Sequence, residues 1–95
     1  MDFEFDFSPE KNAVLKSERS IGFEEIILLI QEGRAIDVVE HPNKEKYPHQ
    51  MVYVVDVRGY IFLVPFVKEG HKIFLKTIYP SRKATKDYLN KSKEA

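Results

Sequence analysis

Residues 51–67, MVYVVDVRGYIFLVPFV, decide the fold of this chain. Two runs rich in β-branched and aromatic residues, which favour strands, flank the dipeptide Arg58-Gly59. A two-residue connection that contains glycine is typical of a tight hairpin turn, so the stretch predicts two antiparallel strands. Pro65 lacks a backbone donor, and we therefore expect the second strand to lie at a sheet edge or to carry a bulge there.

The sequence on both sides of this hairpin extends it into a meander. Residues 68–71, KEGH, predict a second hairpin loop, and residues 71–79, HKIFLKTIY, predict the last strand. Upstream, residues 35–41, AIDVVEH, can form a strand, which the polar loop 41–50, HPNKEKYPHQ, connects to the hairpin. These segments together predict an antiparallel sheet.

The N-terminal third predicts one strand and two helices. Residues 3–7, FEFDF, alternate as a half-buried strand does, and Ser8-Pro9 has the N-cap and first-turn residues of a helix. We expect the inward side of this helix to consist of Ala13, Val14 and Ser17. A second helix is predicted from Phe23, with Gly33 as its C-cap. Its apolar positions at helical spacing are Ile26, Ile27 and Ile30.

A last helix is predicted from Ser81, which completes a single α+β domain over residues 1–95. The expected element order is β-α-α-β-β-β-β-α, with the helices packed on one face of an antiparallel sheet. The absence of cysteine excludes disulfides and thiolate metal sites, and it fits a reducing cytoplasm. No apolar run is long enough to span a membrane. We therefore expect a cytoplasmic protein without a membrane partner.

The charges are unevenly distributed along the chain. Residues 1–40 carry four Lys/Arg against ten Asp/Glu, whereas residues 68–95 carry eight against three. This asymmetry predicts two binding faces, one for an anion and one for a basic partner. The alternative is a dipolar surface without a function. A metal site is not expected, because the neighbouring side chains of Glu40 and His41 would point to opposite faces of a strand, and no cofactor motif is present.

Three short motifs resemble one family. FDFSPEKN at residues 5–12, GFEE at residues 22–25 and SRKAT at residues 81–85 are similar in order and spacing to BrnT-type toxins of the RelE-like group. The chain departs from that pattern in having Glu18-Arg19-Ser20 where typical members have Lys-His-Gly. A Glu common in the last helix falls on Tyr88.

The resemblance implies a RelE-like fold and a metal-independent endoribonuclease that inhibits translation as the toxin of a type II toxin–antitoxin pair. It also implies a ribbon-helix-helix antitoxin as partner, through which alone the toxin would be linked to operator DNA. The alternative is a non-catalytic protein-binding or RNA-binding module on the same fold, which the missing Lys-His-Gly favours.

The last helix carries the strongest candidates for RNA chemistry. Metal-free RNA cleavage needs a base for the 2′-hydroxyl, cations around the phosphorane and an acid for the leaving oxygen. Arg82 and Lys83 match the family's basic motif, and a guanidinium suits phosphate bidentately. Lys86 follows Arg82 by one turn, so it can bind RNA from the same helical face. The alternative for all three is a solvated helix face.

Two further candidates lie near this helix. Lys76 alternates with Phe74 and Ile78, so it could share their face and bind RNA, or it could be a surface lysine with a buried stem. Tyr88 could pack the last helix on the sheet. Alternatively, its phenol beside several cations could have a lowered pKa and transfer protons.

The proline-bracketed loop 41–50 supplies the remaining candidates. His41 and His49 are candidates because histidine is the side chain most suited to proton transfer near neutral pH, although such loop histidines are often only solvated. Lys46 and Tyr47 could bind an unpaired strand of RNA, with Tyr47 stacking on a base.

Overall fold

The central hairpin is present in the computed structural model, which describes residues 3–90. β3 (Met51–Val57) and β4 (Tyr60–Glu69) pair antiparallel from Val57 and Tyr60 at the turn out to Met51 and Phe66. Arg58 and Gly59 have φ angles of 52° and 87°, which a two-residue turn with two left-handed positions requires. The predicted turn is confirmed.

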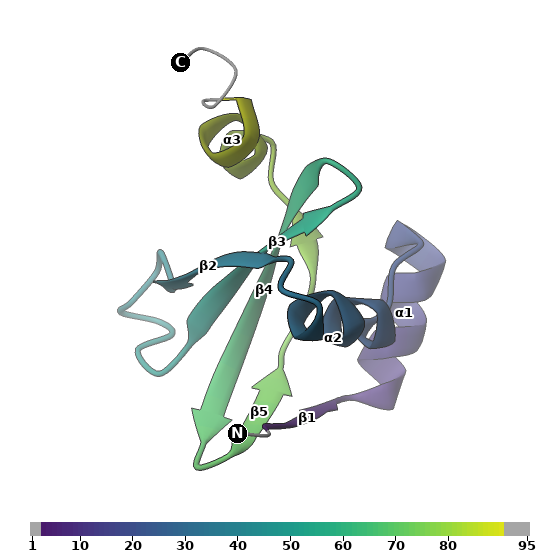
Figure 1. Cartoon of the computed structure of the whole chain (residues 1–95). Coiled ribbons are helices and arrows are strands. Elements are labelled where there is room, and N and C mark those ends of the chain that lie inside the picture. Colours follow the sequence, from purple (N-terminus) through teal and green to yellow (C-terminus); the bar gives the residue numbers. More distant parts are fainter. Residues whose placement is uncertain (1–2, 91–95) are drawn as a thin grey trace.

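Six strands form one sheet around this hairpin, and Figure 1 labels the five longer ones, β1 to β5. β2 (Ala35–Glu40) lies at one edge, antiparallel to β3, and β5 (Lys72–Leu75) pairs antiparallel with β4. β1 (Glu4–Phe7) occupies the other edge and runs parallel to β5, which gives the order β1-β5-β4-β3-β2. The sheet is therefore mixed, and the expectation of a purely antiparallel sheet was wrong. Two helices separate β1 from β2, so the chain crosses from one edge to the other and no hairpin fixes the direction of β1.

The predicted last strand is interrupted. It divides into β5 and a short β6 (Tyr79–Pro80), which pairs with β4 at Leu63 and Phe62. Between them the Lys76 N–H donates to the Pro65 carbonyl at 2.8 Å. Pro65 has no N–H to return, and the ladder breaks opposite it. β4 is thus a central strand whose pairing is interrupted at the proline.

α1 (Pro9–Arg19) starts at Ser8, as the sequence predicts. The Ser8 side chain accepts a hydrogen bond from the Lys11 N–H, and Pro9 occupies the first turn. The inward residues are Asn12 and Leu15, not the expected Ala13, Val14 and Ser17, all of which are exposed. Leu15 contributes apolar surface to the core, and Asn12 is buried because all its polar atoms find partners.

Asn12 joins α1 to α2 (Phe23–Gln31). Its Oδ1 accepts the Phe23 N–H at 2.7 Å, and its Nδ2 donates to both Glu24 carboxylate oxygens at 3.0 Å. The donation from Asn12 to the Glu24 carboxylate is the main reason that the pKa of Glu24 is lowered. Gly22 packs so closely here that an added Cβ would lie 2.8 Å from Asn12 Oδ1. The start of α2 is therefore fixed by side chains of α1.

α2 covers the core with Ile26 fully buried, and Ile27 and Ile30 pack against it partly buried. The helix ends at Gln31 and its C-cap is Glu32, one residue before the predicted Gly33. Gly33 is left-handed, with a φ of 82°, and its N–H donates to the Ile30 carbonyl. Arg34 completes this cap by donating its N–H to the Leu29 carbonyl. Across residues 3–90, no helix has the length and apolar character needed to cross a membrane.

The helices lie on both faces of the sheet. The core beneath α1 and α2 contains alternate residues of the hairpin, namely Val55, Val57, Val64 and Phe66. The other set, Val52, Val54 and Leu63, faces α3 (Arg82–Thr85) and the π-helical turn η1 (Lys86–Asn90) that continues it. The expectation that all helices pack on one face was therefore wrong.

Each edge strand carries an aspartate that binds the next backbone N–H. On β1, Asp6 Oδ1 accepts from the Phe7 N–H at 2.8 Å. On β2, Asp37 Oδ1 accepts from the Val38 N–H, also at 2.8 Å. Across the β2–β3 ladder, the His41 N–H donates to the Gln50 carbonyl, so by strand alternation the Val38 N–H faces away from β3.

Replacing Asn12 with Ala should lower the free energy of unfolding by about 1–3 kcal/mol, because the buried Phe23 N–H then loses its acceptor. Urea unfolding followed by circular dichroism measures this change. Lys11→Ala is the matched control on the exposed side of α1, and such a surface change should stay within about 0.5 kcal/mol. Equal stability of the two variants would show that Asn12 does not join the helices.

Candidate functional site

A groove runs between the last helix and the edge of the sheet. It has a volume of about 230 Å³ and lies between α3–η1 and strands β2, β3 and β4. Its floor is apolar and consists of the strand residues Val39, Val52, Val54 and Leu63, and Ala84 adds apolar surface from the helix. Polar and loop residues complete its lining, namely Glu40, Pro42, Ser81, Lys83, Asp87 and Tyr88. An apolar floor with a few polar groups at the rim is typical of a binding site.

The first turn of α3 is fixed on the central strand. Ser81 caps the helix, because its Oγ accepts the Ala84 N–H at 3.0 Å. The Ser81 N–H donates to the Ile61 carbonyl at 3.0 Å, and the Ile61 N–H donates to Thr85 Oγ1 at 2.8 Å. The helix therefore begins at a defined place on β4, which sets where its side chains project.

Tyr88 reaches across the groove to the edge strand. Its hydroxyl donates a hydrogen bond of 2.6 Å to Asp37 Oδ2. This bond raises the pKa of Tyr88, and partial burial and repulsion from the Asp37 and Asp87 carboxylates raise it further. The expectation of a lowered pKa was wrong, because the phenol lies beside a carboxylate and not among the cations of α3.

The three cations of the last helix differ in their surroundings. The Lys83 ammonium pairs with Asp87 at 3.3 Å and also lines the groove. Arg82 and Lys86 are exposed, and neither has an ion-pair partner among residues 3–90. These two positive side chains are available for an anion on the exposed side of the helix, but neither of them lines the groove.

Lys76 lies on the same face of the sheet as α3. Its ammonium is 5.2 Å from the centre of the exposed Phe74 ring, which confirms that these two share a face. Ile78 does not share it, since it is fully buried in the core beneath α1 and α2. The break between β5 and β6 reverses the alternation between the two residues.

The loop 41–50 gathers its candidates into a separate cluster. The His41 ring packs on Tyr47 with centroids 4.5 Å apart, and the Lys46 ammonium lies 5.4 Å from the Tyr47 ring centre. His41 Nδ1 accepts the Asn43 N–H at 3.0 Å, so in this arrangement the proton of a neutral ring is on Nε2. His41 therefore has one nitrogen already engaged.

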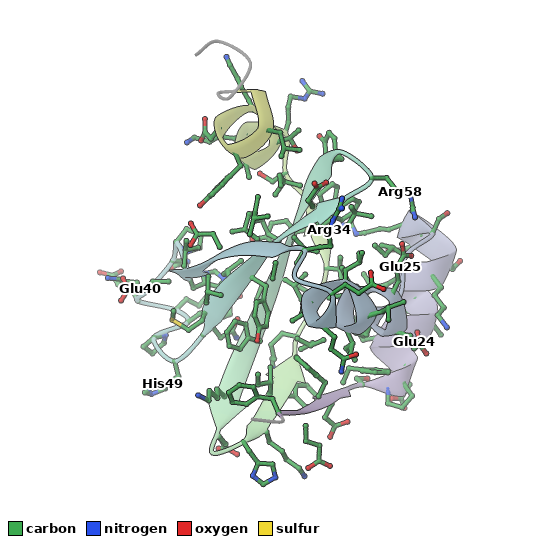
Figure 2. All side chains as sticks on the ribbon, viewed as in Figure 1. Glu24, Glu25, Arg34, Glu40, His49 and Arg58 are labelled. Carbon is green, nitrogen blue, oxygen red and sulfur yellow. The ribbon has the colours of Figure 1, made fainter. Side chains whose placement is uncertain are left out.

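His49 belongs neither to the groove nor to the cluster of His41, Lys46 and Tyr47. It is exposed on the loop, and Figure 2 shows its side chain at the outer border of the molecule, on the opposite side of the loop from α3. The groove therefore brings together Lys83 and Tyr88 of the predicted residues. It does not collect the loop side chains His41, His49, Lys46 and Tyr47, or Lys76.

Asp37, which accepts the hydrogen bond of the groove residue Tyr88, is the residue that sequence reasoning missed. It is the one carboxylate inside the otherwise apolar run AIDVV, where a charged residue needs a partner or solvent. A single carboxylate in an apolar run was therefore the signal in the sequence that Asp37 has a specific partner. Nothing in the sequence shows that the partner is Tyr88, which is 51 positions away.

A second polar region lies beside α2, away from the groove (Figure 2). Arg58 of the hairpin turn pairs with Glu25 at 2.9 Å, and Arg34 pairs with Asp56 at 3.2 Å. These side chains neutralise one another at an exposed surface, so they contribute little beyond positioning the turn against the helix.

Comparison with known protein families, curated proteins and solved structures finds no match to this chain. Within the described part of the chain, no three His, Asp or Glu side chains gather into a group that could hold a metal ion.

Replacing Tyr88 with Phe should reduce stability in a pH-dependent way. Folding raises the pKa of Tyr88 above its ordinary value of 10.0, so the protonated phenol stabilises the fold at any pH below 10.0. This stabilisation is lost as the pH rises through the pKa that Tyr88 has in the folded protein. Urea unfolding should therefore show wild type more stable than Tyr88→Phe at pH 7–9, with the difference falling above about pH 10.

Tyr60→Phe is the control, because the exposed Tyr60 hydroxyl makes no hydrogen bond to the described residues. It should show no such pH-dependent loss. A stability difference between wild type and Tyr88→Phe that stays constant from pH 7 to pH 11 would contradict the role given to the Asp37 hydrogen bond.

Proposed function

We propose that this protein is a metal-independent endoribonuclease that cleaves single-stranded RNA on the face of the sheet that carries α3 and η1. The observation that carries the proposal is the basic last helix, on which Arg82 and Lys86 are exposed and without an ion-pair partner among residues 3–90, and Lys83 and Tyr88 line a groove. Cations at a groove with an apolar floor suit a phosphate chain whose unpaired bases need an apolar surface. In cells the cleavage would inhibit translation, and the protein would act as a toxin.

The fold supports this proposal at a coarse level. The chain is an α+β structure with two helices after the first strand, an antiparallel meander and a last helix. The sequence motifs that resemble BrnT-type toxins lie at the start of α1, the start of α2 and the start of α3. We therefore include a RelE-like fold in the proposal.

The available groups suit cleavage by the neighbouring 2′-hydroxyl. Arg82 would bind the phosphate with two parallel hydrogen bonds, and Lys83 and Lys86 would add positive charge around the phosphorane. Lys76 lies on the same face of the sheet as α3 and would bind the phosphate backbone farther along the RNA strand. No step of this chemistry needs a metal ion or a cofactor.

The proposed partner is a ribbon-helix-helix antitoxin encoded in the same operon. Its acidic or amphipathic part would cover the basic surface of α3, and only the antitoxin would contact operator DNA. The separation of charge between the first 40 residues and the last 28 supports a partner with opposite charges.

A non-catalytic RNA-binding or protein-binding module is the second candidate, and the state of the proton-transfer groups favours it. Tyr88 holds its proton more tightly than a free phenol, and His41 already uses Nδ1. A surface that binds RNA without cleaving it needs only the cations and the apolar floor.

Purified protein free of antitoxin should cleave single-stranded RNA in the presence of EDTA and leave 2′,3′-cyclic phosphate ends. Arg82→Ala should lower the rate by about 10²-fold or more, as loss of a charge-stabilising donor does. Arg82→Lys should recover only part, because the planar fork is lost. Lys11→Ala, which removes a cation from α1, is the matched control and should cleave normally. If wild type leaves the RNA intact with and without ribosomes, the enzyme proposal is wrong and the binding module remains.

The affinity for RNA should depend on salt through the same cations. Each phosphate contact with a single strand contributes a slope of about −0.7 in log K against log salt. The triple variant Arg82→Ala, Lys83→Ala, Lys86→Ala should therefore flatten the slope by about 2. Fluorescence anisotropy with a labelled oligonucleotide measures this. An unchanged slope would place the RNA on another surface.

A further inference from the structure

We infer that Asp37 is a positioning residue that holds the Tyr88 hydroxyl at the groove, so that the two act together in proton transfer. The inference rests on the proposed ribonuclease activity for its chemical role, but the positioning itself does not. Its basis is the 2.6 Å hydrogen bond between side chains of the edge strand and the last helix.

The Asp37 carboxylate has a fixed orientation. Oδ1 accepts the Val38 N–H at 2.8 Å, so the carboxylate is anchored to the backbone of β2, and Oδ2 is left to bind Tyr88. A carboxylate anchored on a strand offers its second oxygen in one direction. The position of the phenol is therefore set by the sheet as well as by the helix.

Tyr88 needs this support because the helix is tied to the sheet mainly at its other end. The hydrogen bonds of Ser81 and Thr85 fix the first turn on β4. Tyr88 lies one turn later, in η1, where the helix changes from α to π geometry. Its bond to Asp37 connects this turn to β2.

The charges around the pair also favour a strong hydrogen bond. Lys83 and Asp87 face the groove from the helix and neutralise each other, and Glu40 faces it from β2, where it pairs with Lys44. β3 and β4 contribute only apolar side chains to the floor. The Tyr88–Asp37 pair is itself exposed, so the strength of its hydrogen bond comes from the charge of the carboxylate acceptor and the short 2.6 Å distance.

In the cleavage step, the Tyr88 oxygen accepts the proton of the 2′-hydroxyl while the phenolic proton moves to Asp37 Oδ2. The 2′-oxygen bonds to phosphorus, and the bond between phosphorus and the 5′-oxygen breaks. The 5′-oxygen takes a proton from the Lys83 ammonium. Solvent then removes the proton from Asp37 and returns one to Lys83, which leaves a 2′,3′-cyclic phosphate and a 5′-hydroxyl. Tyr88 and Lys83 are the catalytic residues, and Asp37 acts through Tyr88.

The positioning is tested without RNA. The ultraviolet difference between a protein and its Tyr88→Phe variant reports ionisation of this one phenol, and it is measured in the wild-type and the Asp37→Asn backgrounds. In Asp37→Asn, Tyr88 should ionise at a lower pH than in wild type, because the amide keeps the shape of the carboxylate but not its charge. Glu32→Gln, which also replaces a carboxylate with an amide but lies at the end of α2, should leave the titration of Tyr88 unaltered. An unaltered titration in Asp37→Asn would overturn the inference.

The chemical role is tested by cleavage of single-stranded RNA in EDTA. Asp37→Asn and Tyr88→Phe should each lower the rate by about 10²-fold or more, as loss of acid–base help does. The double variant should lose little more than either single variant, because the two groups work as a unit.

The possible failures are distinguishable. If wild type cleaves RNA and Asp37→Asn cleaves equally well, the proton role of Asp37 is wrong while the ribonuclease stands. If wild type does not cleave, the proposed function and the proton role both fall, and the Tyr88 titration still decides the positioning. Circular dichroism of each variant separates these results from a loss of folding.

Discussion

The central hairpin is apolar on both of its faces, and this constraint determines the rest of the architecture. Val55 and Val64 are buried on one face, and Val52 and Val54 are buried on the other. An antiparallel sheet with one wet face would alternate apolar and polar residues, whereas this hairpin reads as two nearly continuous apolar runs. Both faces must therefore be covered. α1 and α2 cover one face, and the short α3–η1 segment covers part of the other.

The short cover explains where the groove is. The α3–η1 segment spans residues 82–90, which is too short to cover the whole second face, so apolar surface of β2, β3 and β4 stays open beside it. The first turn is fixed to β4 through Ser81 and Thr85, and the next turn reaches β2 through Tyr88. A space bounded in this way has an apolar floor and a polar rim because a strand face lies below and a charged helix lies above.

Features set by local chemistry were predictable from the sequence, and features set by distant contacts were not. The Arg58-Gly59 turn, the Ser8 cap and the left-handed Gly33 each follow from a few neighbouring residues, and each is present. The parallel pairing of β1 depends on where two helices carry the chain. Likewise, Asn12 could not be recognised as an inward residue, because its partners belong to α2. The placement of the last helix on the second face was foreseeable, since the hairpin has no polar side.

Of the candidate site, the sequence indicated the cations and Tyr88. The hydrogen bond of Tyr88 to Asp37 was not predictable, because it joins two segments that only the fold brings close together.

The two edge strands carry the same device, an aspartate whose side chain occupies the following N–H, at Asp6 on β1 and Asp37 on β2. An unpaired N–H on an outer strand is a template on which another chain can add a strand and begin an aggregate. Here both outer borders of the sheet present a carboxylate at a position where an incoming strand would need a free donor. The carboxylate also adds negative charge, which repels the partly negative carbonyl oxygen of an incoming strand. A small sheet with two apolar faces can thus remain closed to further strands without a barrel or a covering helix at either border.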